Sequence, residues 1–222
     1  MNLPKYIQYA KDVKDGSVKV GKYVRADVDR FLNDLEREDW EWTFSPDLAA
    51  KYIDYIEANC KHTRGSWAGK PFILSPWQAY YLGQLFGWVS KVDGKRRFVT
   101  SYLYVGRKSG KSQMAAGIAM AMAALDGDGA GEYVFAATTR QQARMVFDEV
   151  QRAMRKLPTK ERDKFAVMKH HIEGPNDSRM RPVSSDAHTL DGLSLNLGVV
   201  DEYHAMKAVS YTHLTLPTKR IV

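Results

Sequence analysis

The chain has 222 residues, and its 44% hydrophobic content is enough for one sizeable domain with its own core and a small appendage. It contains no apolar run of about 18 residues, so the sequence predicts no transmembrane helix and no membrane partner. The single cysteine, Cys60, excludes an internal disulfide and a cysteine-based zinc site, which fits a reducing cytoplasm. The formal net charge of +7 favours an acidic partner such as nucleic acid, although many cytoplasmic proteins are equally basic.

The first part of the chain, residues 1–70, is predicted to be a mainly helical region. Within Arg25–Glu38, hydrophobic side chains recur at the spacing of one helix face. A further helix is predicted to begin after Ser45, the expected N-cap, with Pro46 in its first position. The turn-rich sequence "KHTRGSWAGKP" then separates this region from a second domain, which is expected over residues 71–208.

In the second domain the pattern changes to alternating strands and helices. The expected elements, in chain order, are a strand at Arg97–Val105, a helix at Ser112–Leu125, a strand at Glu132–Thr138, a helix after Thr139, short strands within Lys164–Asp191, and a strand at Leu195–His204. Thr139 and Gln142 have the spacing of a capping box, which makes the helix after them the best-marked element. Alternation of this kind predicts an α/β fold with a mostly parallel sheet flanked by helices.

One short stretch, "VGRKSGKS" from Val105 to Ser112, lies between an expected strand and an expected helix. It has the last three residues of the phosphate-loop pattern G-x-x-x-x-G-K-[ST], whereas Val105 occupies the place of the first glycine and Gly106 comes one residue late. Gly110 would let successive backbone N–H groups point at phosphate oxygens at the start of the helix. Lys111 would bridge the β- and γ-phosphates, and the Ser112 hydroxyl would ligate Mg²⁺.

Two extra cations, Arg107 and Lys108, stand inside this stretch and would offset the missing glycine. The alternative interpretation is a solvated basic turn in which Gly-Lys-Ser occurs by chance, because so short a match recurs in unrelated sequences. A second motif is therefore needed to separate a nucleotide site from an accidental match.

The second motif is "LGVVDE" (Leu197–Glu202), an apolar strand that ends in two acids. Asp201 would hold Mg²⁺, directly or through water, and Glu202 would polarise the attacking water. The alternative is an ordinary strand end with two exposed acids. Because the two motifs occur in the expected order, about 90 residues apart, they predict a P-loop NTPase fold of the RecA/ASCE-like kind.

Four segments in this order resemble the large terminase subunit of tailed bacteriophages, the motor that packages viral DNA. The similar segments, within about residues 23–207, are "FILSPWQAYYLGQLFGW" (Phe72–Trp88), "VGRKSGKS", "VFAATTRQQARMVFDEV" (Val134–Val150) and "DAHTLDGLSLNLGVVDEYHAMK" (Asp186–Lys207). Gln78 has the place of the family's adenine-side glutamine. The family's phosphate loop commonly lacks its first glycine and has an arginine four residues before the lysine, which here is Arg107.

The resemblance implies an ATPase that uses ATP and Mg²⁺ to drive double-stranded viral DNA into a procapsid. It implies that Glu202 and Arg107 are catalytic, Arg107 by stabilising charge on the γ-phosphate, with ground-state phosphate binding as the alternative for Arg107. The expected ATP-binding residues are Gln78, Gly106, Arg107, Lys108, Ser109, Gly110, Lys111 and Ser112, and the expected metal ligands are Ser112 and Asp201. The implied partners are the portal protein, the small terminase subunit and further copies of the chain, in the cytoplasm of the host.

The chain departs from the family pattern after Glu202, because neither the coupling motif nor the nuclease domain of the family follows. We therefore expect a truncated ATPase half without nuclease activity, and we expect the last segment, residues 209–222, to be non-native. One alternative is a superfamily-2-like helicase ATPase fragment, which the sequence "DEYH" suggests. Another is a non-catalytic DNA-binding module with a degenerate phosphate loop.

Two further features have no assigned role. The loop Ser184–Gly192 and the N-terminal helices are candidates for DNA contact. The tryptophans are expected to pack in the core or at the interface of the N-terminal region, with stacking on a ligand as the alternative. These residues are Trp40, Trp42, Trp67, Trp77 and Trp88.

Overall fold

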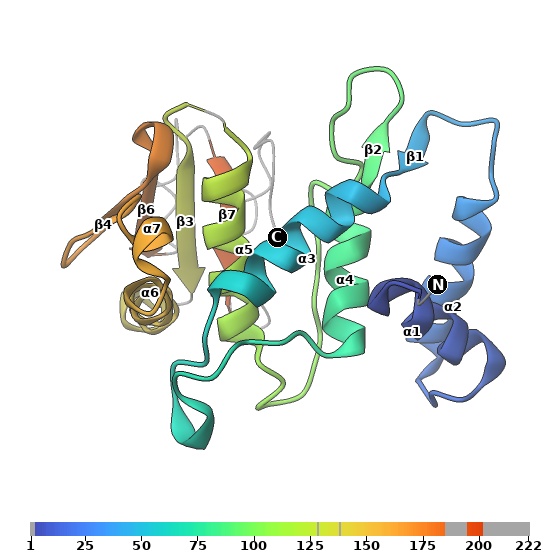
Figure 1. Cartoon of the computed structure of the whole chain (residues 1–222), viewed down its shortest axis with the longest axis horizontal. Helices are drawn as coiled ribbons and strands as arrows, with labels where there is room; N and C mark the ends of the chain where they lie inside the picture. Colours follow the sequence, from blue (N-terminus) through green and yellow to red (C-terminus); the bar gives the residue numbers. More distant parts are fainter. Residues whose placement is uncertain (1–2, 128, 138, 185–194, 202–222) are drawn as a thin grey trace. The chain divides into compact units, whose positions relative to one another are not determined.

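The structure is a computed structural model of the whole chain, and it describes residues 3–127, 129–137, 139–184 and 195–201 (Figure 1). The chain divides into two compact units. The first unit combines Met1–Asp54 with Ile73–Phe98, and the second combines Tyr55–Phe72 with Val99–Val222. The expected domain boundary at residue 71 stays a prediction, and so does the nature of residues 209–222, which lie outside the described residues.

The first unit is mainly helical. Its elements are α1 (Lys5–Asp15), α2 (Lys22–Leu35), β1 (Trp42–Phe44), the first part of α3 (Pro46–Asn59), α4 (Pro76–Gly87) and β2 (Trp88–Ser90). Helix α3 begins where the sequence predicts, and Ser45 Oγ accepts a hydrogen bond from the Leu48 N–H at 3.3 Å. Strands β1 and β2, which the sequence analysis did not predict, form a short antiparallel pair with Thr43 opposite Val89.

Aromatic side chains form the core of the first unit. Phe31 of α2 and Tyr80 of α4 meet edge to face with 5.5 Å between their ring centroids. Phe44 and Trp88 meet in the same way at 5.3 Å, and Phe31 also contacts both of these rings. Edge-to-face pairs are favourable because the positive rim of one ring lies against the negative face of the next.

A buried chain of hydrogen bonds runs beside this aromatic core. Trp88 Nε1 donates to Gln84 Oε1 at 3.0 Å, Gln84 Nε2 donates to the Tyr80 hydroxyl at 2.8 Å, and that hydroxyl donates to Asp27 Oδ2 at 2.8 Å. Burial and the nearby Asp27 carboxylate both raise the pKa of Tyr80. The hydroxyl therefore stays protonated and keeps its place in the chain.

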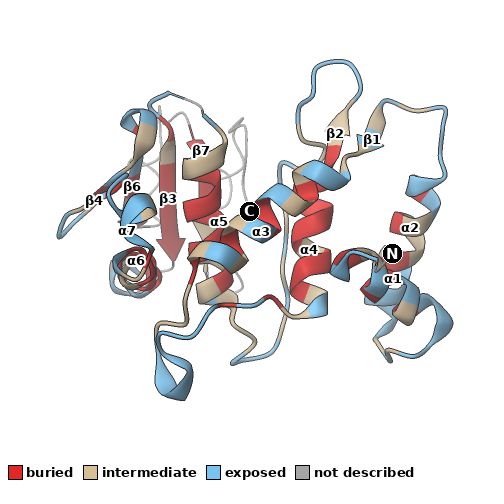
Figure 2. Ribbon diagram, in the orientation of Figure 1, coloured by how far each residue is buried: buried red, intermediate tan, exposed pale blue. Residues whose placement is uncertain are grey.

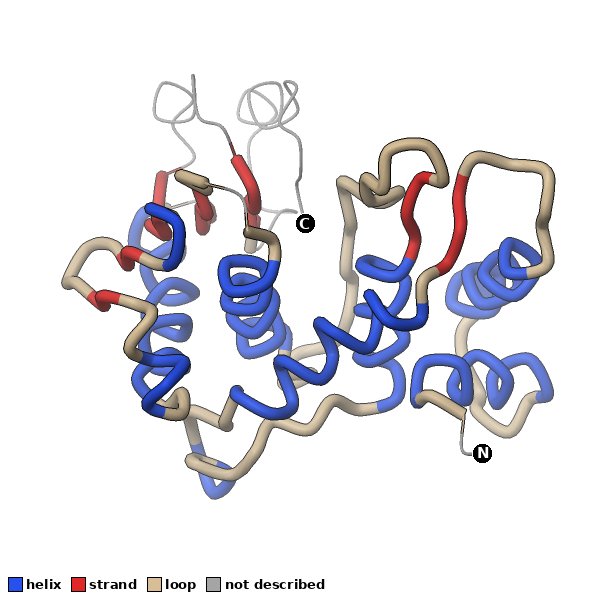
Figure 3. The backbone as a smooth tube through the Cα atoms, turned by 45° about the horizontal axis from the view of Figure 1, so that its top comes forward, coloured by secondary structure: helices blue, strands red, loops and turns tan. Residues whose placement is uncertain are grey.

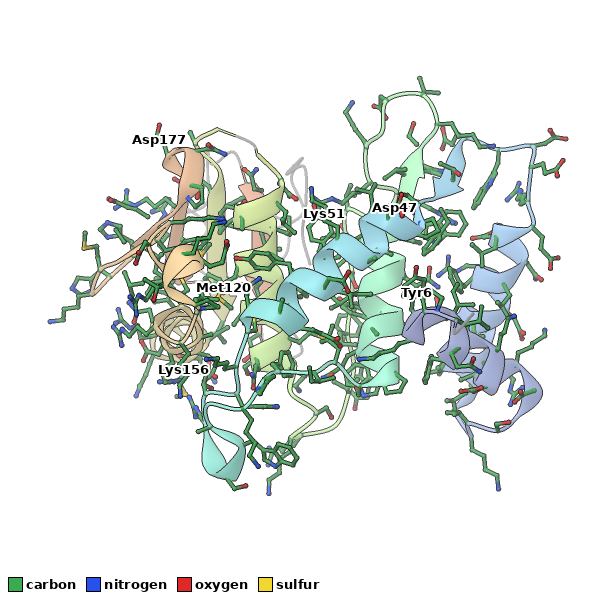
Figure 4. The ribbon with its side chains drawn as sticks, viewed as in Figure 1. Tyr6, Asp47, Lys51, Met120, Lys156 and Asp177 are labelled. Atoms are coloured by element: carbon green, nitrogen blue, oxygen red, sulfur yellow. The ribbon has the colours of Figure 1, made fainter. Side chains whose placement is uncertain are left out.

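Helix α1 covers α4 in the same unit, and Tyr6 lies against it (Figure 4). Gly83 of α4 leaves room for this ring, because a Cβ at Gly83 would lie 3.0 Å from Tyr6 Cγ. Glycine here serves close helix packing and not backbone conformation.

A five-stranded mixed sheet forms the centre of the second unit, in the order β4-β5-β6-β3-β7 (Figure 3). The strands are β3 (Glu132–Ala137), β4 (Ala166–Val167), β5 (Ile172–Glu173), β6 (Arg179–Ser184) and β7 (Leu195–Val200). Strand β3 pairs in parallel with both β6 and β7, whereas the short strands β4 and β5 pair antiparallel at one edge. The expected α/β fold is confirmed, with a parallel centre and an antiparallel edge.

Both helices that the sequence predicts in the second domain, α5 (Lys111–Leu125) and α6 (Arg140–Arg155), are present. The second unit also contains the end of α3, η1 (Gly65–Trp67), α7 (Thr159–Arg162) and η2 (Pro175–Asp177). The expected capping box of α6 is confirmed, because the Gln142 N–H donates to Thr139 Oγ1 and the Thr139 N–H donates to Gln142 Oε1, both at 3.2 Å. Helix α6 packs on β3 and β6, with Phe147 against Phe135, and α5 packs beside α6. Figure 2 shows α5 buried along most of its length.

One expected strand is absent from both described sheets. In the described part of the chain residues 97–105 join no ladder, although Thr100 is a bridge residue and the side chains from Ser101 to Val105 alternate between half-buried and exposed, as in an extended chain. The β-branched and aromatic composition of this segment correctly indicates an extended backbone. A strand also needs a neighbour that supplies hydrogen bonds along its length, and composition carries no information about that neighbour.

The expectation that the tryptophans pack in the core or at the interface of the N-terminal region is wrong for Trp67, for which stacking on a ligand stays the alternative. Its side chain is 60% exposed, whereas Trp88 is buried in the first unit. Trp67 lies at the end of the short helix η1, none of whose residues is buried.

None of the described helices has the length and apolar composition that crossing a bilayer requires.

Candidate nucleotide-binding site

The stretch Gly106–Gly110 forms a compact turn directly before α5. Gly110 is the N-cap of the helix and has φ 79° and ψ 15°, a left-handed conformation that side chains disfavour. Lys108 also has a positive φ, 65°, which is uncommon for a residue other than glycine and costs backbone strain. Ser109 Oγ donates a hydrogen bond to the Gly106 carbonyl oxygen at 2.7 Å and closes the turn.

Lys111, the first residue of α5, directs its ammonium group back over this turn. Its Nζ lies 3.5 Å from the carbonyl oxygen of Val105, at the outer limit of a hydrogen bond. A charged phosphate oxygen would make a shorter and stronger contact with the same ammonium group. Lys111 is therefore placed to exchange a weak backbone contact for a phosphate.

The start of α5 is electropositive. Its first turn contains no acidic residue, and the first N–H groups of any α-helix lack intrahelical acceptors. Arg107, Lys108 and Ser112 are exposed around it. Backbone N–H groups, the positive end of the helix dipole and two cations together suit a polyphosphate ligand.

Asp201 is the described residue that follows β7. Its backbone N–H donates to the Ala136 carbonyl oxygen at 2.9 Å, so it continues the ladder between β7 and β3 at the carboxyl ends of both strands. Helix α5 begins on the side of the sheet toward which β3 points (Figure 1). The structure therefore brings Asp201 and the turn before α5 to the same edge of the sheet. Glu202 lies outside the described residues.

A magnesium ion would fit the donors at this edge. The described residues contain no group of three or more histidine, cysteine, aspartate or glutamate side chains suited to hold a metal. Mg²⁺ bound with a nucleotide needs few protein ligands, because phosphates and waters complete its octahedron. The Ser112 hydroxyl and the Asp201 carboxylate are hard oxygen donors of the kind that this ion prefers.

Gln78, the expected adenine-side residue, belongs to the first unit, whereas the turn Gly106–Gly110 belongs to the second. Gln78 is buried near the start of α4, and its Oε1 accepts a hydrogen bond from the Ser75 N–H at 2.9 Å. This contact is the helix-capping role that the sequence also allows. Contact between Gln78 and adenine stays a prediction.

Gln113, in the first turn of α5, is a residue of this site that was not predicted from the sequence. Its Nε2 donates to the Lys61 carbonyl oxygen at 3.0 Å, and its Oε1 lies 3.1 Å from His62 Nδ1. The helix that carries Lys111 and Ser112 is thereby tied to a loop 51 residues earlier in the chain. No spacing or composition signal in the sequence indicates this contact.

Comparison with known proteins identifies the family of this chain. The family model described as "Terminase large subunit, ATPase domain" matches residues 76–215, more than half of the chain. None of the curated proteins compared with the chain matches it.

Among solved structures, the chain is similar to the large terminase of bacteriophage HK97, with a TM-score of 0.63 and 21% sequence identity. That similarity covers 78% of this chain and 36% of the HK97 chain. The chain is also similar to the ATPase domain of the large terminase of Thermus phage P74-26, with a TM-score of 0.40 and 20% identity, over 53% of this chain and 55% of that chain. At 21% identity, the likeness to the HK97 protein shows a shared fold.

Proposed function

Because the chain belongs to the terminase large subunit ATPase family, we propose that it hydrolyses ATP to drive double-stranded DNA into a viral procapsid. The observation that carries this proposal is the turn Gly106–Gly110, which places Lys111 at the start of α5 on the sheet edge where Asp201 follows β7. In P-loop enzymes, a glycine-containing turn at the start of a helix, beside the carboxyl ends of parallel strands, binds polyphosphates.

In this proposal the residues of the turn, the start of α5 and the end of β7 have separate roles. The N–H groups at the start of α5 hold phosphate oxygens, and Lys111 neutralises charge on the β- and γ-phosphates. Ser112 and Asp201 would hold Mg²⁺, which would supply further positive charge at these phosphates. Glu202, the residue after Asp201, orients and polarises the attacking water.

Arg107 is the second catalytic residue of the proposal. It is exposed in the turn before Lys111, from where a guanidinium group can stabilise charge that develops on the γ-phosphate in the transition state. Arg107→Ala should lower turnover about 100-fold or more while changing ATP affinity little. Weaker binding with unchanged turnover would instead assign Arg107 to ground-state phosphate binding.

The partners proposed for the chain follow from the same family. They are double-stranded viral DNA, the portal protein, the small terminase subunit and further copies of the chain, in the cytoplasm of the host cell. The family match favours this assembly over a helicase. The chain spans 36% of the HK97 chain, and for that reason the activity of the whole motor is part of the proposal.

The test is ATP binding and hydrolysis by the chain and by Lys111→Ala, with and without duplex DNA. The variant should lose about 100-fold or more of the hydrolysis rate, because its ammonium group is removed from the phosphates. Lys160→Ala is a matched control, because Lys160 is an exposed lysine of the same unit. Equal hydrolysis by Lys111→Ala and the unchanged chain would refute the proposal, and DNA binding without any ATP binding would support a non-catalytic module.

A further inference from the structure

Residues Lys61–Lys70, called the basic loop below, form a closed loop in the second unit. The His62 N–H donates to the Lys70 carbonyl oxygen at 2.9 Å, and the Gly69 N–H donates to the His62 carbonyl oxygen at 2.8 Å. Next to these, the Phe72 N–H donates to the Cys60 carbonyl oxygen at 2.9 Å. The loop is therefore fixed by its own backbone and does not need a ligand to order it.

A buried carboxylate holds the basic loop on α6. Glu149 is 5% exposed and accepts hydrogen bonds from Thr63 Oγ1, from Arg64 Nε at 3.0 Å and from Arg152 Nη2 at 2.9 Å. Burial opposes ionisation of Glu149, but the hydrogen bonds from Thr63 and Arg152 and the charges of both arginines hold its pKa below the usual value. The loop is therefore anchored to the protein by an ionised, well-satisfied group.

The outer part of the basic loop presents two cations and an exposed indole ring. Trp67 is 60% exposed, the Lys70 ammonium lies 4.7 Å from its ring centroid, and the Arg64 side chain is 67% exposed. No aspartate or glutamate occurs in the sequence between Glu57 and Asp93. An exposed aromatic ring among cations, without acids nearby in the sequence, is a surface suited to a phosphate backbone.

The same loop is bound to the helix that starts at the phosphate turn. Gln113 holds the Lys61 carbonyl oxygen at 3.0 Å and the His62 ring nitrogen at 3.1 Å. Gln113 follows Lys111 and Ser112 in the first turn of α5. A shift of this turn on phosphate binding would therefore be transmitted to the basic loop through two side-chain contacts.

We propose that the basic loop binds the phosphate backbone of duplex DNA and that Gln113 couples this contact to the nucleotide site. The coupling rests on the proposed ATPase function, whereas the DNA contact does not. Backbone contact fits better than base stacking, because Lys70 lies over the Trp67 ring and the His62 ring lies beside it, 5.9 Å away. Trp67 then serves to hold Lys70 in place by a cation–π contact.

The DNA contact is tested by titrating the chain, without nucleotide, into a short labelled duplex at several salt concentrations. Lys61→Ala/Lys70→Ala should weaken binding about tenfold and reduce the slope of log affinity against log salt by about 1.8, because each lost phosphate contact removes about 0.9. Lys160→Ala/Lys169→Ala removes the same charge from exposed positions of the same unit and should leave the slope unchanged. Equal slopes for the two double variants would overturn the proposal.

Trp67→Ala separates backbone contact from two other uses of an exposed ring. It should weaken duplex binding about threefold, through loss of the cation–π contact, and leave ATP binding unchanged. A larger loss for single-stranded than for duplex DNA would show that the ring stacks on bases. A loss of ATP affinity without DNA would show that the loop belongs to the nucleotide site. Either result would overturn the proposal.

The coupling is tested by measuring duplex affinity with and without a non-hydrolysable ATP analogue. In the chain the analogue should change duplex affinity by about fivefold or more, and DNA should change the affinity for the analogue by the same factor. Gln113→Leu should bring this factor close to one and leave duplex affinity without nucleotide unaltered. A factor of one in the unchanged chain would refute the coupling. Failure to bind the analogue at all would refute the proposed ATPase function and leave the salt test of the loop decisive.

Discussion

The two units of the chain are stabilised by different kinds of core. The first unit is filled by large rings that meet edge to face, such as Phe31 and Tyr80, and by a buried chain of hydrogen bonds. The second unit has α5, whose buried residues are mostly alanine, methionine and glycine, beside a parallel sheet. A Cβ on Gly117 would lie 3.3 Å from Ile56, so this helix packs closely.

We infer from this difference a division between support and chemistry: the first unit contributes mainly to stability, and the second unit carries the proposed chemistry. The small side chains of α5 let most of the helix lie buried in the second unit, with Ser112 of its first turn exposed. The groups that bind phosphate in our proposal are all at that turn or at the sheet edge next to it. Substitutions in the first unit should therefore change stability and leave phosphate binding unaltered, whereas substitutions at the turn should lower phosphate affinity with a smaller effect on stability.

The largest expected effect is a loss of folding stability when the aromatic core of the first unit is changed. Phe31→Ala should lower the free energy of unfolding by about 3–5 kcal/mol, because it removes a buried ring that contacts Phe44, Tyr80 and Trp88. Chemical denaturation monitored by circular dichroism measures this loss. The affinity of the remaining folded protein for ATP should be unchanged, and a matching loss of affinity would contradict the separation of the two cores.

The next effect concerns the anchor of the basic loop. Glu149→Gln should lower the free energy of unfolding by about 1–3 kcal/mol at neutral pH, because a buried charged acceptor of three hydrogen bonds is removed. The share from Arg64 is small, since that side chain is mostly exposed.

The loss of stability caused by Glu149→Gln should become smaller as pH falls. The pKa of Glu149 is lower in the folded protein than its usual value of 4.5, so the stabilisation is complete above pH 4.5 and fades as pH falls below it. Unfolding curves at several pH values measure this. Glu41→Gln, a change at an exposed glutamate of the first unit, is the control. A difference between the chain and Glu149→Gln that stays constant to low pH would exclude an ionised anchor.

A smaller stability effect is expected at the phosphate turn. Gly110→Ala should cost about 1–2 kcal/mol, because alanine disfavours the left-handed backbone at φ 79°. Gly127→Ala is a matched control, since Gly127 has φ 71° in the same unit and open space around it. Both variants should lose similar stability, but only Gly110→Ala should lose ATP affinity. Equal ATP affinity in both variants would show that the turn does not bind phosphate.

Local sequence signals were sufficient for the elements whose formation is local. The capping residues Thr139 and Gln142 and the apolar spacing after them predicted α6, and Gly110 with Lys111 and Ser112 predicted the turn at the start of α5. These features depend on residues within one or two helical turns of each other. Their prediction therefore required no knowledge of the tertiary structure.

Features that depend on distant partners were not predictable in the same way. Residues 97–105 have the composition of a strand but join neither described sheet, because pairing depends on neighbours elsewhere in the chain. Trp67 was expected to pack and is exposed, and the contact between Gln113 and His62 joins residues with no shared motif. The type and spacing of hydrophobic residues do not determine which side chains of a loop are exposed to solvent.

The rate at which Cys60, the single thiol of the chain, reacts with a thiol reagent measures whether the two cores open separately. Cys60 is 2% exposed at the base of the basic loop, and burial raises its pKa to about 12. Both features suppress reaction with thiol reagents, because the thiolate is the reactive form. Labelling at pH 8 should therefore be slow and limited by opening of the second unit.

The labelling rate of Cys60 can then be measured in variants of either unit and compared. Glu149→Gln should accelerate labelling under native conditions, because it loosens the anchor of the loop that begins after Cys60. Phe31→Ala, although it costs more stability, should accelerate labelling less, because its cavity lies in the other unit. If Phe31→Ala accelerates labelling as strongly as Glu149→Gln, the aromatic core and the sheet open as one cooperative unit, and the division between support and chemistry fails.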